Sequence, residues 1–147
     1  MTRAELLGFL RRHELAVEAS VGPAGVPQAA VVGYVVTDAL EIFFDTLASS
    51  RKAVNLEADP RCALVVGWDE EQTVQVEGVA DFPTGAERQA LLATYLRRFP
   101  DGYRRLRLPD ITHVRVRPRW IRYSDFRGEK PVVAEWDEAA LSRREAR

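Results

Sequence analysis

The sequence predicts a mainly β protein of the α+β type, an antiparallel barrel of six or seven strands with two or three helices packed outside it. Short stretches of alternating or β-branched apolar residues recur along the chain and are joined mostly by brief turns. The few segments with helical spacing do not alternate regularly with the strands, which disfavours a parallel, doubly wound sheet. With 147 residues, of which 46% are hydrophobic and 29% charged, the chain should form a single domain over residues 1–147.

The first third of the chain predicts one helix and three strands. A capping box that starts at Thr2 favours a short helix over residues 3–12. Polar and apolar residues alternate over residues 14–21, as in a strand with two different faces. Residues 28–37 are apolar on both faces, which predicts a central strand buried on both sides, and residues 40–46 predict the next strand.

The rest of the chain predicts two further helices and four strands. One helix should begin at a serine cap at Ser49 or Ser50 and end before Pro60, because the residue before a proline avoids the helical region. A hairpin follows, with Gly78 as a candidate bulge, and the longest helix then ends at Pro100. The remaining predictions are strands at residues 62–68, 73–82, 111–117 and 119–125, the last two divided by Pro118, and a polar tail over about residues 127–147 with a candidate helix at 137–146.

Composition argues against several classes of function. The formal net charge is -1, so no global charge favours nucleic acid. Eight arginines give residues 103–127 a local net charge of +6, which predicts a solvated strand face, with a surface that faces an anion or a cofactor as the alternative. One cysteine, Cys62, and two histidines, His13 and His113, are too few soft ligands for a structural zinc site. No apolar run is long enough to span a membrane, and the charged N-terminus lacks a signal-peptide pattern, which predicts a cytoplasmic protein.

The stretch from Phe44 to Lys52 is the strongest candidate for chemistry. A strand ends and a helix begins there, so hydroxyls, free backbone N–H groups and two cations, Arg51 and Lys52, meet at one helix N-terminus. The other two capped helices instead place a glutamate in the first turn, where the helix dipole favours an acid. A bound phosphate would explain the two cations. The alternative is that both cations pair with Glu57 or Asp59.

A series of short motifs follows in order along this part of the chain: Phe44-Asp45-Thr46, Ser50-Arg51-Lys52-Ala53, Asn55-Leu56, Asp59-Pro60-Arg61 and a strand that ends at Trp68. In this combination the motifs resemble those of the pyridoxamine 5'-phosphate oxidase-like, FMN-binding split-barrel family. The resemblance covers nearly half of the chain, and the later strands fit the same barrel. It implies a split barrel that forms a homodimer, with FMN at each subunit interface and a small-molecule substrate.

The resemblance also implies roles for individual residues. Ser50, Arg51 and Lys52 would hold the cofactor phosphate, and Asp45 and Thr46 would lie along the ribityl chain or the ring edge. No side chain is assigned a catalytic role, because a flavin itself performs hydride or electron transfer. The candidates near the isoalloxazine ring are Ala30, Val31 and Val32 on one strand, Gln75 as a polar contact, and Trp120, an aromatic residue for which a place in the core is the alternative.

The sequence leaves alternatives open for both the cofactor and the activity. Residues 29–36 lack the basic residue that true pyridoxamine 5'-phosphate oxidases carry on this strand, and the end of the chain lacks their substrate-gripping tryptophan and arginine. These departures argue against pyridoxal phosphate synthesis. The leading prediction is an FMN-dependent oxidoreductase. The alternatives are an F420-dependent reductase on the same fold and a module that binds flavin or heme without turnover.

Overall fold

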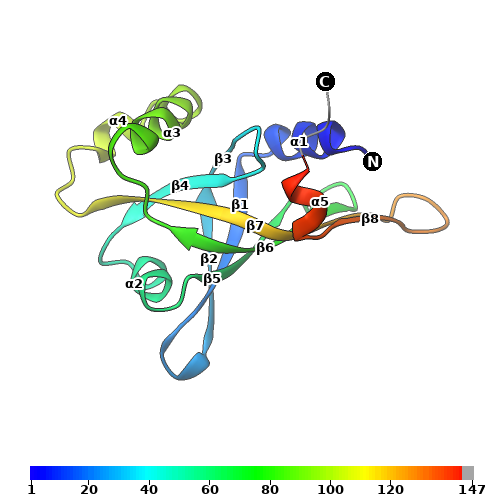
Figure 1. The fold of residues 1–147 in the computed structure, drawn as a ribbon, viewed down its shortest axis with the longest axis horizontal. Helices are drawn as coiled ribbons and strands as arrows, with labels where there is room; N and C mark the ends of the chain where they lie inside the picture. Colours follow the sequence, from blue (N-terminus) through cyan, green and yellow to red (C-terminus); the bar gives the residue numbers. More distant parts are fainter. Residues whose placement is uncertain (144–147) are drawn as a thin grey trace.

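The computed structural model describes residues 1–143 as one curled antiparallel sheet with helices outside it (Figure 1). This confirms the predicted mainly β barrel; it has more elements than predicted because β3, β8, α4 and α5 are each only two to five residues long. The helices are α1 (Arg3–Arg12), α2 (Arg51–Ala58), α3 (Gly85–Arg98), α4 (Gly102–Arg105) and α5 (Glu138–Ser142), with a 3-10 turn at Pro23–Gly25. The strands are β1 (Leu15–Val21), β2 (Pro27–Gly33), β3 (Val35–Val36), β4 (Ile42–Leu47), β5 (Arg61–Val66), β6 (Gln72–Asp81), β7 (Ile111–Asp125) and β8 (Val132–Trp136).

The sheet curls into a split barrel because β2 and β3, which are consecutive in the sequence, form the two opposite ends of its strand order. Neighbouring strands follow the order β2-β1-β5-β6-β7-β4-β3, and β8 pairs with β7. β2 pairs with β1 at one end and β3 pairs with β4 at the other, yet only Tyr34 separates β2 from β3. The Tyr34 hydroxyl donates a hydrogen bond of 2.5 Å to the carbonyl oxygen of Leu10, which ties this break to α1.

The predicted central strand at residues 28–37 is therefore wrong, since β2 and β3 lie at opposite ends of the strand order. Val32 is buried in the barrel, whereas its neighbour Val31 is 61% exposed. A strand with one face in the core and the other on an apolar surface has the same sequence pattern as a strand buried in the middle of a sheet.

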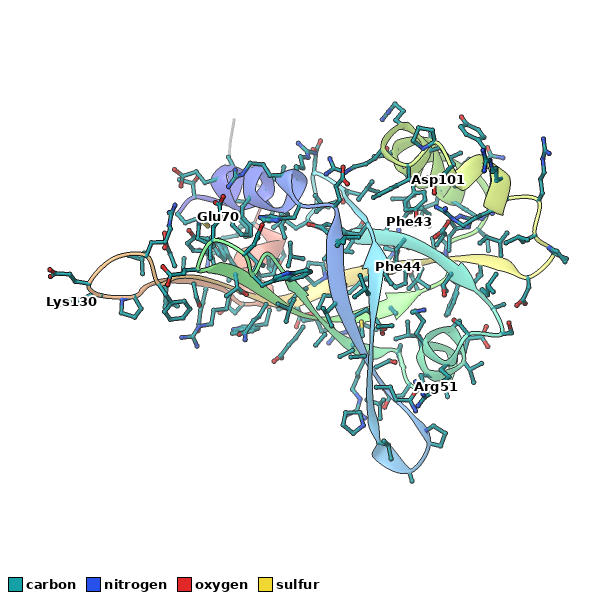
Figure 2. The ribbon with its side chains drawn as sticks, turned by 180° about the vertical axis from the view of Figure 1, so that it is seen from behind. Phe43, Phe44, Arg51, Glu70, Asp101 and Lys130 are labelled. Atoms are coloured by element: carbon teal, nitrogen blue, oxygen red, sulfur yellow. The ribbon has the colours of Figure 1, made fainter. Side chains whose placement is uncertain are left out.

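Two apolar clusters form on the two faces of β4. Phe44 faces the barrel interior and belongs to the larger cluster, together with Ile42 and Val114. Phe43 faces the other way and packs with Leu91 and other residues of α3. Figure 2 labels both phenylalanines on this strand. Because side chains alternate along a strand, the next two residues of β4 also point in opposite directions.

Residues 111–117 and 119–125 form one continuous strand of 15 residues, β7, and not two strands divided by Pro118. β4 pairs with β7 as far as Val116, and β8 pairs with it from Ile121 onward. Pro118 thus lies where one side of β7 has no partner strand, so its missing N–H need not interrupt a hydrogen-bond ladder.

The predicted bulge at Gly78 is confirmed. The register between β6 and β7 shifts between Glu77 and Gly78, and Gly78 lies opposite Pro118. A Cβ atom on Gly78 would be 2.5 Å from the carbonyl oxygen of Arg117. Only glycine allows the two backbones to approach this closely.

The predicted polar tail is partly a strand. β8 pairs with the end of β7, and Trp136 and Leu141 pack against the barrel core. α5 is shorter than the helix predicted at residues 137–146, and the prediction for residues 144–146 lies outside the described residues. The valines of β8 are largely exposed, so the segment has no clear alternation between a core face and a solvent face.

The helices are short and cover openings or faces of the barrel. The longest, α3, has 14 residues, and it packs against β3 and β4. α2 packs against β1, β2 and β6. Within residues 1–143, no helix combines the length and the apolar composition that crossing a bilayer requires.

Candidate functional site

The N-terminus of α2 carries two cations and no acid. Ser50 is the N-cap residue, and its Oγ accepts a hydrogen bond of 3.3 Å from the backbone N–H of Ala53. Arg51 and Lys52 occupy the first two helical positions, where backbone N–H groups have no partner within the helix. Both charges oppose the helix dipole, which favours an anion at this end.

Neither cation is paired with a carboxylate. Asp59, one of the two predicted alternatives, binds Arg61 with hydrogen bonds of 2.9 and 2.6 Å from Nε and Nη2. In the described part of the chain, no carboxylate oxygen, including those of Glu57, lies within 4.0 Å of a side-chain nitrogen of Arg51 or Lys52. Among the described residues, neither cation of this helix start therefore forms a direct ion pair.

Two of the predicted phosphate-site residues, Ser50 and Lys52, lie together with Thr46, which was predicted to lie along the ribityl chain or the ring edge. The Oγ1 of Thr46 lies 3.0 Å from the Oγ of Ser50 and accepts a hydrogen bond of 3.3 Å from the Nζ of Lys52. The end of β4 and the first turn of α2 thus present two hydroxyls and an ammonium group at one point. This is the donor set that a phosphate oxygen needs.

A cavity of about 280 Å³ lies beside this cluster, between α2 and the β1–β2 hairpin. Arg51, Lys52 and the predicted residue Ala30 line it, and Figure 2 shows Arg51 on α2 beside the hairpin. The remaining lining residues were not predicted from the sequence. They are Glu18, Ser20, Gln28 and Ala29.

Glu18 is a buried acid within this cavity. Its side chain is 0% exposed, and neither carboxylate oxygen has a hydrogen-bond partner. Burial raises the pKa of the Glu18 carboxyl, and the charge of Lys52 opposes this shift. The predicted alternation of residues 14–21 is present, but its polar positions Glu18 and Ser20 face inward while Leu15 is exposed. The sequence feature that could have indicated their burial is the alternation itself, which places Glu18 and Ser20 on the same face of the strand as Ala16.

A buried amide organises the cavity floor. Asn55 is 5% exposed, and its Nδ2 donates to the Oγ of Ser20 at 3.1 Å and to the Oε1 of Gln28 at 2.9 Å. With its oxygen engaged, Gln28 has its amide N–H groups left to donate into the cavity. The Asn55-Leu56 motif therefore supports the site from behind.

Asp45 lies outside this cluster. Its Oδ1 accepts a hydrogen bond of 3.0 Å from the Tyr95 hydroxyl, and its Oδ2 accepts one of 2.5 Å from the Nε of Arg105. Adjacent residues on a strand face opposite sides, so Asp45 points toward α3 and α4 while Thr46 points toward α2. The two side chains therefore have their partners on opposite sides of β4.

The predicted ring contacts are divided between two faces of the sheet. Ala30 and Val32 face inward, and Val32 is 6% exposed. Val31 and Gln75 are exposed on the outer face, in one row that runs from β2 across β1 and β5 to β6. Trp120 is half-buried in the neighbouring row on β7.

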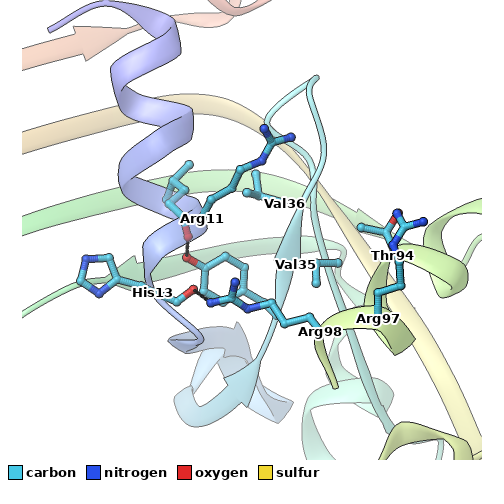
Figure 3. A pocket seen from close by; sticks show the side chains of 9 residues that line it. Arg11, His13, Val35, Val36, Thr94, Arg97 and Arg98 are labelled. Carbon is cyan, nitrogen blue, oxygen red and sulfur yellow. Dashed lines mark hydrogen bonds between the residues drawn. The ribbon is translucent and has the colours of Figure 1, made fainter. Parts of the chain in front are cut away.

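A second cavity, of about 350 Å³, lies between α1, β3 and α3 (Figure 3). Its cations have partners within the protein, although the Nε of Arg98 has none. Arg11 pairs with Asp38 at 2.5 Å, and the Nη2 of Arg98 donates to the carbonyl oxygen of His13 at 3.3 Å. Arg97 donates to a threonine hydroxyl on the same helix. These guanidinium groups are less available to a ligand than the two cations of α2.

The fold is a split barrel in which α2, with two cations in its first turn, connects β4 to β5, and comparison with known proteins identifies the family. The family model described as pyridoxamine 5'-phosphate oxidase matches residues 2–125, which end at the last residue of β7. The chain therefore belongs to the pyridoxamine 5'-phosphate oxidase family. The family is confirmed as the sequence motifs predicted.

One curated relative shares part of its sequence with this chain. Over 77 residues it is 39% identical to a pyridoxine/pyridoxamine 5'-phosphate oxidase from Cupriavidus metallidurans, and the match covers 52% of this chain and 36% of that protein. The chain thus matches only about a third of the curated relative's length.

Solved structures confirm the fold at low sequence identity. A heme binding protein from Mycobacterium smegmatis has a TM-score of 0.81 at 20% identity, over 96% of this chain and 60% of that one. A pyridoxamine 5'-phosphate oxidase-related, FMN binding protein from Nostoc punctiforme has a TM-score of 0.65 at 14% identity, over 91% and 93% of the two chains. The same fold therefore occurs in proteins described as binding heme and as binding FMN.

Proposed function

We propose that this chain binds FMN and serves as an FMN-dependent oxidoreductase acting on a small molecule, with the cofactor phosphate at the N-terminus of α2. The observation that carries this proposal is the pair of cations, Arg51 and Lys52, which line the cavity and have no ion-pair partner among the described residues. Their combined charge matches that of a phosphate monoester, which is close to a dianion at neutral pH. The FMN-binding relative supports the choice of ligand.

The donor set fits a phosphate group. The hydroxyls of Thr46 and Ser50, the amide of Gln28 and the first-turn N–H groups of α2 surround the two cations. A phosphate bound there would convert unfavourable charge at the helix start into charge-assisted hydrogen bonds. Bound FMN would supply hydride or electron transfer, while this chain would hold the cofactor and set the electrostatics around it.

The outer face of β2, β1 and β5 supports a homodimer as the binding unit. A sheet face in water usually carries polar side chains, and a large contiguous apolar patch marks an interaction site. A second copy, related by a two-fold axis, would cover this face and bring Val31, Gln75 and Trp120 near a shared ring site. The outward positions carry small or apolar residues except for Arg61; they are Leu15, Val17, Ala19, Val21, Pro27, Ala29, Val31, Gly33, Ala63 and Val65.

The absorption spectrum of the purified protein, followed by mass spectrometry of the released ligand, tests the cofactor. We expect a flavin spectrum, FMN as the released compound and tighter binding of added FMN than of riboflavin. A deazaflavin band would favour the F420 alternative, and a Soret band would favour a heme-binding module. Either result, or a protein that takes up no added FMN, contradicts the proposal.

Light scattering tests the dimer. The expected mass is twice the 16.6 kDa of one chain, and Val31→Glu should shift it toward the monomer because the glutamate would be buried unpaired at the interface. Glu77→Gln, a change on the same outer face that removes a charge, should leave the dimer intact. A monomeric wild-type protein that binds FMN tightly would contradict the shared site while leaving the phosphate site in place.

A further inference from the structure

Glu18 places a carboxyl group where the proposed function needs only cations and hydrogen-bond donors. The side chain is completely buried, it lines the same cavity of about 280 Å³ as Arg51 and Lys52, and its two oxygens have no partner. A buried carboxylate without a partner is costly, so residues of this kind are either neutral or satisfied by a ligand.

The surroundings of Glu18 contain few groups that could balance its charge. β2 faces it with Ala30, its cross-strand neighbour, and contributes no titratable side chain. β5 faces it with Leu64 and with the thiol of Cys62, whose pKa burial raises to about 12, so the thiol stays neutral. α2 contributes Arg51 and Lys52, the two cations of the cavity.

The charge count then depends on the proton of Glu18. With a neutral carboxyl, the two cations of α2 face the ligand alone, and they balance a phosphate dianion. With an ionised carboxylate, one of the two positive charges is cancelled, and a like charge sits in the same cavity as the phosphate. An ionised carboxylate and a phosphate in one cavity repel each other. A protonated carboxyl can instead donate its O–H to a phosphate oxygen.

We infer that Glu18 is a specificity-determining residue of the phosphate site: it is protonated in the complex and donates to the phosphate, so that a phosphate dianion binds together with one proton. This inference rests on the proposed function, because it assigns a role within the same cavity. It also implies that the cavity selects its ligand by charge. FMN should lose affinity as the pH rises, and riboflavin, which lacks the phosphate, should not.

Fluorescence titrations of FMN and riboflavin from about pH 7 to about pH 9 test the inference, because the phosphate is a dianion throughout this range. In the wild type, the Kd of FMN should rise with pH by up to about tenfold per unit, the limit for one linked proton. In Glu18→Gln, a neutral residue of the same shape, the Kd of FMN should be nearly independent of pH. Glu57→Gln makes the same chemical change at an exposed position of α2 and should keep the wild-type slope.

Calorimetry of the wild type in two buffers of different ionisation enthalpy gives a measurement that needs no variant. It should show net uptake of a proton with FMN and none with riboflavin. A flat FMN profile in the wild type, equal slopes in the wild type and Glu18→Gln, or no proton uptake would overturn the role of Glu18 and leave FMN binding intact. Failure of the wild type to bind FMN at any pH would overturn the proposed function as well.

Discussion

The arginine-rich segment at residues 103–127 and the start of α2 both concentrate positive charge, but they use it differently. In the first region five of the eight arginines pair with acids from other parts of the fold; they are Arg105, Arg115, Arg117, Arg119 and Arg122. Arg105 bridges Asp45 and Asp101, and Arg115, only 4% exposed, contacts Asp81 at 2.6 Å. At α2 the cations have no such partners, and the nearest buried acid, Glu18, is itself without a hydrogen bond.

This difference shows that a run of like charges along a sequence is a poor guide to a binding site. Much of the local excess in residues 103–127 is balanced by the fold, because strands and helices from distant parts of the chain supply carboxylates. The two cations of α2 make a smaller cluster, but it remains uncompensated. Uncompensated charge at a cavity, and not the total charge of a segment, indicates a ligand.

The largest effect should come from removing the buried arginine of the matched region. Arg115→Met removes the buried partner of Asp81 and Glu87 and leaves these acids only the exposed Arg117. It should lower the free energy of unfolding by about 3 kcal/mol, near the lower end for a buried pair because both acids are partly hydrated. Urea denaturation measures this loss. Arg117→Ala, which removes a 53% exposed arginine beside the same acids, should cost less than about 1 kcal/mol. Equal losses would mean that burial does not distinguish the two arginines.

The next effect concerns ligand affinity. Arg51→Ala or Lys52→Ala should weaken FMN binding by about tenfold to a hundredfold, the loss of one charge-assisted hydrogen bond, and should weaken riboflavin binding much less. The stability of the apo-protein should stay unchanged or rise slightly, since each cation opposes the helix dipole. Fluorescence titration and urea denaturation give the two numbers.

Lys130→Ala is the matched control for these variants. Figure 2 shows Lys130 at the tip of the loop between β7 and β8, far from Arg51. Its loss removes the same charge from the protein but should leave the affinity for FMN unchanged. If this variant weakened FMN binding as much as Lys52→Ala, long-range charge and not the α2 site would account for the affinity.

A smaller effect should separate Asp45 from the cofactor site. Asp45→Asn weakens the hydrogen bonds from Tyr95 and Arg105 and should lower the stability by about 1.5 kcal/mol, with no change in FMN affinity. Asp101→Asn, at the exposed end of the same arginine, should cost less. A loss of FMN affinity in Asp45→Asn without a loss of stability would restore the predicted cofactor contact.

The smallest effect is spectroscopic. Trp120→Leu should brighten the fluorescence of bound flavin if the indole lies against the ring, because a stacked aromatic side chain quenches flavin emission. Binding should persist, since the phosphate contacts remain. Unchanged emission together with lower stability in urea would place Trp120 in the packing of the outer face instead.

The sequence predicted those features that depend on local chemistry. The capping box at Thr2, the helix start at Ser50 and the bulge at Gly78 all appear in the structure, because caps and bulges are set by a few neighbouring residues. The grouping of Thr46, Ser50 and Lys52 followed from the same local reasoning about where a strand ends and a helix begins.

Features that depend on distant partners were missed. Nothing within residues 28–37 shows that Tyr34 divides the segment between the two ends of the sheet, or that Pro118 lies in a gap between two partner strands. The place of Asp45 depended on Arg105, which is 60 residues away in sequence. The sequence identified Glu18 as a polar position of its strand, but its burial depends on α2 and β5, which cover the inner face of β1.

The lining of the cavity and the closure of the barrel draw on segments that are separated by very different distances along the chain. The cavity is built by residues 18–52, whereas closure requires β4 to find β7, as in the pair of Ile42 with Val116. Contacts between such distant segments form slowly, in milliseconds to seconds for small β-rich domains. The folding rate should therefore be governed by closure and be insensitive to FMN. A ligand held only by the closed barrel would act on the reverse step, by slowing unfolding.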